Sequence, residues 1–276
     1  MLEKLEITSR NNELVKWISS LKDKKGRRES GSFIAEGVKL TLEAISAGMP
    51  ITHILVSKGE ETRIVPLIEE ALENVSRTDC RLYVLSESAF EKISTEKAPQ
   101  GVITVIKYLD NFNYTDIIYK EEFFLKQSEK AIVLCSLRDP SNLGAVIRSA
   151  VAFGVDHIIL TNDCADHYSP KTVRAAMGSL FKVKLTVISD LAQFIKSAQE
   201  NHRRVYAAEL SDNAVSLADL ELCRTDLFVI GNEGHGIPEE ISSLTDLSVY
   251  IPIAENVESL NASVAASVFL WELSKK

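Results

Sequence analysis

The sequence predicts an α/β protein with two domains, a smaller one at the N-terminus and a larger one built on a mainly parallel sheet. Three observations support this. The chain has 276 residues, which is long for one average domain and comfortable for two. Its composition, 45% hydrophobic and 25% charged, is that of an ordinary soluble globular protein. Apolar runs of strand length alternate with helical segments, a pattern typical of a parallel sheet covered on both faces.

The first part of the chain reads as a small alternating α/β domain over residues 1–108. Gly48 and Pro50 close its second helix, as stop signals do. In the following stretch, 109–130, the hydrophobic residues follow neither a helical nor a strand period, and we expect this stretch to be a linker. The elements expected in this domain are helices at 11–21, 37–47 and 66–75, and strands at 32–36, 51–57, 81–86 and 101–108.

The second domain is expected over residues 131–276, where the alternation is most regular. Asp139 and Pro140 suit a helix entry, because Asp caps helices and Pro fits the first helical position. An apolar stripe at helical spacing follows, and Gly154 ends that helix. The strands expected here are 131–136, 157–160, 204–208, 227–231 and 249–253, and a final helix covers about 260–273.

Charge and composition exclude several classes of protein. A net charge of −8 argues against a protein that coats nucleic acid through bulk charge. The N-terminus lacks the apolar core of a signal peptide, and no apolar stretch is long enough to span a bilayer. Four scattered cysteines indicate reduced thiols, so we expect a cytoplasmic protein with no membrane role.

One local cluster of positive charge departs from this acidic balance. Such a run can hold phosphates even on an acidic protein, although it is equally compatible with a solvated loop. It consists of Lys22, Lys24, Lys25, Arg27 and Arg28.

Polar residues gather in three segments, each where a strand meets a loop or helix. The first, 139–150, carries Asn142 and Arg148 on an otherwise apolar helix. The second, 228–237, is a glycine-rich turn with an acidic residue, Glu233, and its glycine spacing fits neither a dinucleotide nor a phosphate loop. The third, 251–266, offers Ser259 as a helix N-cap and Asn261 in the first turn. Ligands bind beyond the carboxyl ends of parallel strands, so this placement suits a site.

Two other kinds of chemistry have little support. A serine hydrolase is not indicated, because the sequence has no G-x-S-x-G motif. The five histidines show no pairing typical of a metal site, so we expect no metal. His235, the one histidine in the glycine-rich turn, is interpreted as structural.

Taken in order, the three segments resemble the motifs of the SpoU (TrmH-type) RNA 2'-O-ribose methyltransferases, a family of the SPOUT superfamily. The resemblance covers roughly residues 130–276. Residues 173–183 are similar to the segment that these proteins carry between their first two motifs. In the N-terminal part, 9–12 and 33–37 resemble the ribosomal-protein-like substrate-binding domain of many members.

The resemblance implies a fold, a cofactor and a site. The fold would be a SPOUT domain with a deep trefoil knot, and the family acts as a homodimer. The methyl donor would be S-adenosylmethionine, and the cofactor-binding residues implied are Gly231, Asn232, Gly234, Ile251, Ser259 and Leu260. The polar active-site positions that match are Asn142, Arg148, Glu233, Ser259 and Asn261.

The family assigns proton removal from the ribose hydroxyl to the arginine that matches Arg148. Arginine is almost always protonated, so two explanations stay open. Arg148 loses a proton in a site that disfavours its charge, or it stays charged and orients the hydroxyl or an adjacent RNA phosphate, which itself accepts the proton.

The expected substrate is a structured RNA, and 23S ribosomal RNA is favoured by the two-domain architecture. Transfer RNA, and an inactive RNA-binding or ribosome-associated module, are the alternatives. The cations expected to contact RNA are Arg10, Lys22, Lys24, Lys25, Arg27, Arg28, Lys171 and Arg174.

Overall fold

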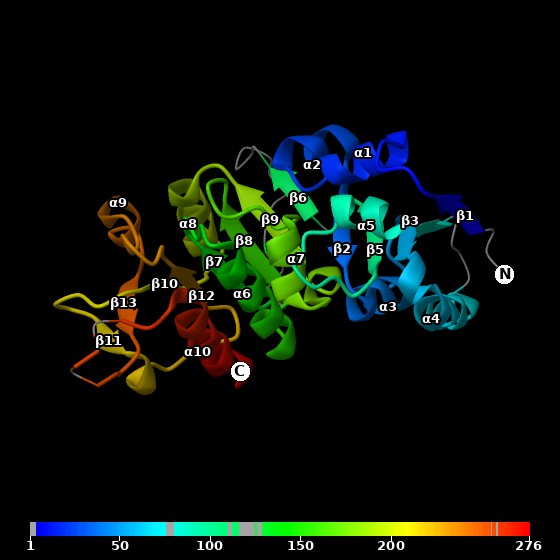
Figure 1. Cartoon of the computed structure of the whole chain (residues 1–276). Coiled ribbons are helices and arrows are strands. Elements are labelled where there is room, and N and C mark those ends of the chain that lie inside the picture. The colour runs from blue at the N-terminus through cyan, green and yellow to red at the C-terminus, as the bar shows by residue number, and fades with distance from the viewer. Residues whose placement is uncertain are drawn as a thin grey trace. The chain divides into compact units, whose positions relative to one another are not determined.

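The structure, a computed structural model, describes residues 4–75, 80–109, 112–115, 125, 129–254, 256–257 and 259–276 (Figure 1). The chain divides into two compact units. Unit 1 consists of Met1–Asp110 and Asp166–Lys182, and unit 2 consists of Asn111–Ala165 and Val183–Lys276. A segment from the second half of the sequence therefore packs with the N-terminal part of the chain.

Unit 1 is built on a five-stranded mixed sheet in the order β1-β4-β3-β5-β2. Its strands are β1 (Lys4–Ile7), β2 (Ser32–Glu36), β3 (Ile51–Ser57), β4 (Arg81–Leu85) and β5 (Val102–Lys107). Its helices are α1 (Glu13–Ser20), α2 (Lys24–Ser30), α3 (Val38–Ser46), α4 (Glu61–Glu73), α5 (Glu87–Ile93) and α7 (Pro170–Ala176). The small α/β domain predicted at the N-terminus is confirmed, with β1 and α5 as additional elements.

Two helices of unit 1 differ from the sequence prediction. Lys24, Lys25, Arg27 and Arg28 of the basic run lie in a helix, α2, for which the sequence analysis gave no element, and Gly31 ends this helix in the left-handed conformation at φ 58°. Helix α4 begins at Glu61 and carries Pro66 inside it, whereas the prediction used Pro66 as the helix start. Buried residues on both sides of the proline, Ile64 and Ile68 among them, extend the helix through it, because burial outweighs the one lost backbone hydrogen bond.

Unit 2 contains an eight-stranded sheet in the order β11-β13-β10-β12-β7-β8-β9-β6, and its strand pairs are parallel. The strands are β6 (Phe112–Thr115), β7 (Ala131–Leu134), β8 (His157–Thr161), β9 (Lys184–Ile188), β10 (Val205–Ala208), β11 (Val215–Ser216), β12 (Leu227–Ile230) and β13 (Leu247–Tyr250). The helices are α6 (Pro140–Ala152), α8 (Leu191–Glu200), α9 (Glu239–Ser242) and α10 (Ala262–Ser274). The predicted parallel sheet is confirmed.

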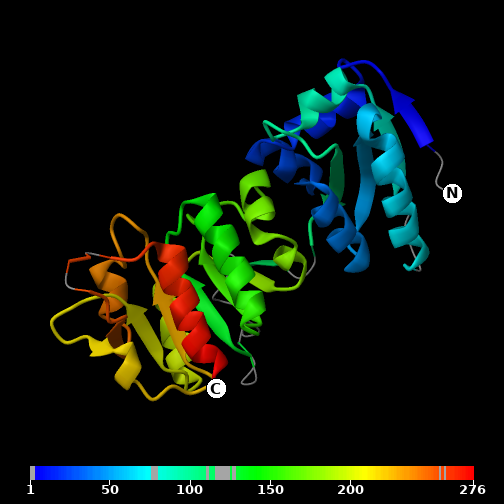
Figure 2. The ribbon, with the colours of Figure 1, turned by 60° about the horizontal axis from the view of Figure 1, so that its bottom comes forward.

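Helices cover both faces of this sheet (Figures 1 and 2). Val229 belongs to the buried cluster that includes Phe194 of α8. The preceding residue, Phe228, points to the other face of the sheet. There its ring centroid lies 4.6 Å from the ring centroid of Phe269 on α10. Helix α6 packs against α10 on this face, where Ser149 and Ser267 are hydrogen-bonded at 2.8 Å.

Most of the expected linker lies outside the described residues. Within it, residues 112–115 form β6, which pairs with β9 at one edge of the sheet. Strand β9 itself was not expected from the sequence. No helix in the described ranges is both long and apolar enough to cross a membrane.

Two buried histidines predict that the protein loses stability in mild acid. Burial lowers the pKa of His157 to about 4 and also lowers that of His167. An unfolded histidine titrates near 6.5, so the unfolded chain binds more protons than the folded one between these values. The contribution of these histidines to the free energy of unfolding is therefore fully present above pH 6.5 and is lost as the pH falls toward 4. Each pKa unit corresponds to roughly 1.4 kcal/mol.

Denaturant unfolding between pH 4 and pH 7.5 measures this effect. We expect His157→Gln to flatten part of the pH dependence, since glutamine can keep a hydrogen bond to Thr186, which now lies 2.8 Å from His157 Nε2, but cannot take up a proton. Identical pH profiles for the wild type and the variant would contradict the assignment.

Candidate active site

Hydrogen bonds join the residues that follow the carboxyl ends of β7 and β12 at one edge of the unit 2 sheet. The amide of Cys135 donates to the carbonyl of Ile230 at 2.8 Å, and the side-chain Nδ2 of Asn232 donates to the carbonyl of Ser136 at 2.8 Å. Ser136 adopts φ 56°, a left-handed backbone that is uncommon for a residue with a side chain. The loops that leave these two strands are thereby held side by side.

Helix α6 begins as the sequence predicts. The Oδ1 atom of Asp139 accepts hydrogen bonds from the amides of Ser141 at 2.7 Å and Asn142 at 3.0 Å, and Pro140 takes the first helical position. Because Asp139 satisfies these amides, the Asn142 side chain is not needed for capping and is available for other contacts.

The glycine-rich turn after β12 is a tight backbone hairpin. Asn232 and Gly236 exchange two backbone hydrogen bonds, at 3.0 and 2.9 Å. Gly231 lies so close to the opposite side of the turn that a Cβ atom there would lie 2.5 Å from the carbonyl oxygen of Gly236. The Oδ1 atom of Asn232 accepts from the amide of Gly234 at 2.8 Å. The turn presents Glu233 to solvent at its tip.

Asn261, rather than Ser259, caps the last helix, which corrects the sequence prediction. Helix α10 begins at Ala262, and Asn261 Oδ1 accepts from the amides of Ser263 at 2.9 Å and Val264 at 3.3 Å. Ser259 lies two residues before the cap and is exposed. The N-cap is the residue directly before the first helical residue. Because α10 begins at Ala262, that residue is Asn261.

Three of the predicted polar residues form one hydrogen-bonded chain. Capping holds Asn261 Oδ1 toward α10, so its Nδ2 points outward and donates to Asn142 Oδ1 at 3.2 Å. Asn142 Nδ2 in turn donates to the Glu233 carboxylate. Each amide has one donor and one acceptor end, so the cap of one helix sets the orientation of the next two side chains. The predicted convergence of three distant segments is thus present.

Arg148 is not part of this chain of contacts. It lies six residues beyond Asn142 on α6, about 9 Å along the helix axis, and its side chain is exposed. It makes no hydrogen bond or ion pair with any residue that the structure describes.

The neighbouring strand ends suit a small organic ligand with an apolar part. The strands β12, β10 and β13 are adjacent, and loops leave all three at the same edge. Apolar side chains are exposed there, with Leu210 80% exposed after β10 and Ile253 39% exposed after β13. Ile251 and Leu260 are partly buried. Apolar side chains with a few polar groups are the usual lining of sites for small organic ligands. Among the described residues, no three His, Cys, Asp or Glu side chains are grouped to hold a metal ion.

The cations expected to contact RNA fall into different environments. Arg10, Lys24, Lys25, Arg28 and Lys171 are exposed. Lys22 is partly buried, and its Nζ donates to the carbonyls of Lys92 at 2.7 Å and Ser94 at 2.6 Å. Arg174 pairs with Glu96.

Arg27 is not on the surface. It is 3% exposed, so it cannot contact an RNA phosphate as the sequence led us to expect. Its ion-pair partner, Asp166, was not singled out from the sequence, because no local pattern links residues 139 positions apart.

The fold and the site agree with comparisons to known proteins. The model of the SpoU rRNA Methylase family matches residues 129–271, and that of the MRM3-like substrate binding domain matches residues 12–104. The chain is 30% identical to the 23S rRNA (guanosine(2553)-2'-O)-methyltransferase RlmP of Bacillus subtilis, over 97% of this chain and 98% of that protein.

Solved structures agree over the whole length. An rRNA methyltransferase from Sinorhizobium meliloti superposes with a TM-score of 0.82 at 28% identity, covering 99% of this chain and 98% of that one. An AdoMet-bound rRNA methyltransferase from Sinorhizobium meliloti superposes with a TM-score of 0.80 at 29% identity, covering 99% of this chain and 98% of that one. The fold and these matches define an RNA methyltransferase. The chain belongs to the SpoU rRNA methylase family.

Proposed function

We propose that this protein transfers a methyl group from S-adenosylmethionine to a ribose 2'-hydroxyl of 23S ribosomal RNA. The observation that carries the proposal is the hydrogen-bonded chain of Asn261, Asn142 and Glu233, which lies at the same sheet edge as the exposed apolar side chains. The Bacillus subtilis relative named for this reaction on 23S rRNA supports the choice of substrate.

The residues of the chain would act mainly by positioning. When bound, S-adenosylmethionine supplies an activated methyl group with a neutral leaving group, so no metal is needed. The residues that would hold the cofactor are Gly231, Asn232, Gly234, Ile251, Ser259 and Leu260. The Glu233 carboxylate would accept a hydrogen bond from the ribose hydroxyl. Asn142 holds that carboxylate in place, and Asn261 orients Asn142. Aligning two reactants in this way lowers a barrier by roughly 7–11 kcal/mol.

Arg148 is proposed as essential for catalysis, either as the base or as a cation that orients the hydroxyl or an adjacent phosphate. Its exposed position leaves it accessible to RNA or to a second copy of the chain. We propose a homodimer, supported by the exposed apolar side chains of α10, where Val264 is 49% and Trp271 51% exposed.

The remaining proposals concern domains, topology and location. Residues 1–108 would bind RNA and 131–276 would carry out the transfer, in the cytoplasm. A trefoil knot in the second part is proposed from the resemblance to the SPOUT superfamily, since the chain belongs to the SpoU rRNA methylase family. The cations proposed to contact RNA are Arg10, Lys22, Lys24, Lys25, Arg28, Lys171 and Arg174.

Labelling of unmodified RNA tests the proposed function. The enzyme is incubated with methyl-labelled S-adenosylmethionine and either 23S rRNA or tRNA, each transcribed in vitro. We expect label in the 23S rRNA and a primer-extension stop typical of a 2'-O-methyl group. Arg148→Ala should reduce the rate at least about 100-fold, as loss of a group that assists proton transfer does.

Lys196→Ala is the matched control for this variant, because Lys196 is an exposed cation on α8, the helix on the opposite face of the sheet. It should retain wild-type activity. Label in tRNA and none in 23S rRNA would show that the substrate is tRNA. RNA binding without any methyl transfer would favour the inactive module.

A further inference from the structure

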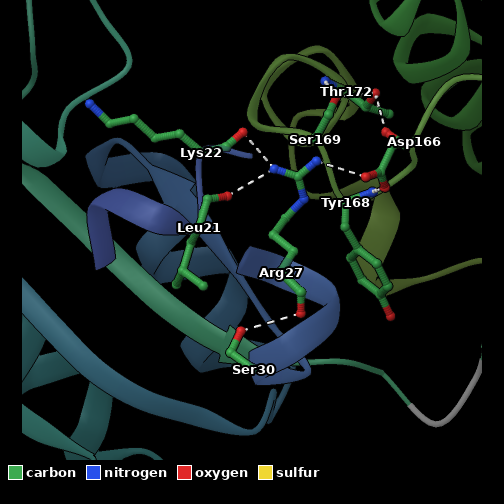
Figure 3. A network of polar contacts seen from close by, with 8 residues as sticks. All are labelled: Leu21, Lys22, Arg27, Ser30, Asp166, Tyr168, Ser169 and Thr172. Carbon is green, nitrogen blue, oxygen red and sulfur yellow. Dashed lines mark hydrogen bonds and ion pairs between the residues drawn. The ribbon is translucent and has the colours of Figure 1, made fainter. Parts of the chain in front are cut away.

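Arg27 differs from the other cations of its helix in being buried. Lys24, Lys25 and Arg28 are exposed, whereas Arg27 is 3% exposed. Figure 3 shows its guanidinium group directed toward the carbonyls of Leu21 and Lys22 and the carboxylate of Asp166. Its Nη1 atom donates to the carbonyls of Leu21 at 2.8 Å and Lys22 at 2.7 Å. These carbonyls lie just beyond the end of α1, so Arg27 fastens α2 to the residues that precede it.

The third contact of Arg27 reaches a part of the sequence far away. Its Nη2 atom donates to Asp166 Oδ2 at 2.7 Å. Asp166 is the first residue of the segment 166–182 that packs within unit 1. Its other oxygen, Oδ1, accepts from the amide of Tyr168 at 2.9 Å, and its carbonyl accepts from Thr172 Oγ1 at 2.9 Å. Asp166 therefore links α2 to the beginning of α7.

Stability alone is a poor explanation for this ion pair. Replacing a buried ion pair by well-packed apolar residues often leaves the stability of a protein unchanged or increases it. The Nε atom of Arg27 is also buried without a hydrogen-bond partner among the described residues, which a pair selected for stability would avoid. What the pair does provide is a specific geometry between two short helices.

Both helices carry exposed cations and neither is long enough to be stable alone. Helix α2 has seven residues and α7 has seven, and isolated helices of this length are unstable in water. Their placement therefore depends on tertiary contacts such as the Arg27–Asp166 pair. Lys24 lies near enough to this segment for its charge to add to the effect of burial in lowering the pKa of His167.

We propose that Arg27 and Asp166 are positioning residues for RNA recognition. Their buried ion pair holds α2 and α7 so that Lys24, Lys25 and Arg28 form one phosphate-binding surface with Lys171. This proposal rests on the proposed function. It assigns no direct RNA contact to either member of the pair.

Asp166→Asn gives the sharpest test, because charge and positioning predict opposite results. Removing a negative charge near a phosphate-binding surface would strengthen RNA binding if only net charge mattered. Loss of positioning would weaken it. We expect the KM for RNA to rise at least tenfold in Asp166→Asn and Arg27→Lys, with the KM for S-adenosylmethionine and kcat at saturating RNA within twofold of wild type.

Glu43→Gln is the matched control. Glu43 forms an ion pair at 2.8 Å with Lys182, at the other end of the same segment, and its loss should leave all three parameters within twofold. Thermal unfolding identifies any variant that fails to fold. An unchanged or lower KM for RNA in folded Asp166→Asn would overturn the proposal, as would an equal rise in Glu43→Gln.

The outcome can be separated from failure of the proposed function. If the wild type methylates no RNA, that function fails. The affinities of the same variants for a labelled 23S rRNA transcript, measured by fluorescence anisotropy, then decide the role of the pair by the same criteria.

Discussion

Gly231→Ala is expected to abolish nearly all methyl transfer while leaving the fold intact. The added Cβ would lie 2.5 Å from the carbonyl oxygen of Gly236 and 2.6 Å from the nitrogen of Ile237. Both neighbours are backbone atoms, so no side chain can rotate away to make room. The turn must open, which breaks the hydrogen bonds between Asn232 and Gly236 and moves Glu233 away from Asn142. Misplacement of a positioned group by about 1 Å reduces rates roughly 100-fold.

Gly234→Ala is the comparison within the same turn. A Cβ at Gly234 would meet only the side-chain oxygen of Asn232, at 3.4 Å, which is an ordinary contact. We expect kcat/KM to fall at least about 100-fold in Gly231→Ala and much less in Gly234→Ala. Calorimetric titration with S-adenosylmethionine should show the same order. Equal activities of the two variants would mean that the shape of the turn does not control the site.

Tyr168→Ala should destabilise unit 1, although Tyr168 lies in the second half of the sequence. Its side chain is 1% exposed and stacks on Tyr108 with ring centroids 4.2 Å apart. Its hydroxyl accepts from the amide of Leu109 at 2.8 Å. Truncating a large buried aromatic side chain leaves a cavity and lowers the free energy of unfolding by about 3–5 kcal/mol.

Hydrogen exchange measured by mass spectrometry locates the effect. We expect faster exchange in the strands of unit 1, such as β2 and β5, with little change in β7 and β12 of unit 2. Tyr168→Phe keeps the ring and loses the acceptor for the Leu109 amide, so its expected loss is smaller, about 1–3 kcal/mol. Destabilisation confined to unit 2 would show that segment 166–182 does not support unit 1.

Local patterns in the sequence predict most elements of unit 2. Apolar runs mark β7, β8, β10 and β12, and the Asp139-Pro140 pair marks the start of α6. The run predicted at 249–253 overlaps only the end of β13, which covers Leu247–Tyr250. Strand β9 was missed, because its residues, KLTVI, include a charged and a hydroxyl side chain that weaken the apolar signal. Strand β6 was missed because nothing in its four residues distinguishes it from the surrounding stretch; its pairing with β9 makes it a strand.

The site was predictable as a set of residues but not as an arrangement. Asn142, Glu233 and Asn261 were identified by their order along the chain. Their hydrogen bonds depend on which residue caps each helix, and the cap of α10 is Asn261 rather than Ser259. The separation of Arg148 from this cluster, by contrast, follows from its place six residues beyond Asn142 on a helix that the sequence predicts.

By itself, the sequence determined the α/β class, the alternating elements and the three motifs, because these depend on the spacing and type of neighbouring residues. Only the tertiary structure decided that residues 166–182 pack in unit 1 and that Arg27 is buried against Asp166 rather than exposed beside Arg28. The physical reason is that burial and ion pairing depend on neighbours far away in the chain. Two adjacent arginines of one helix are alike in sequence and differ only in what packs against them.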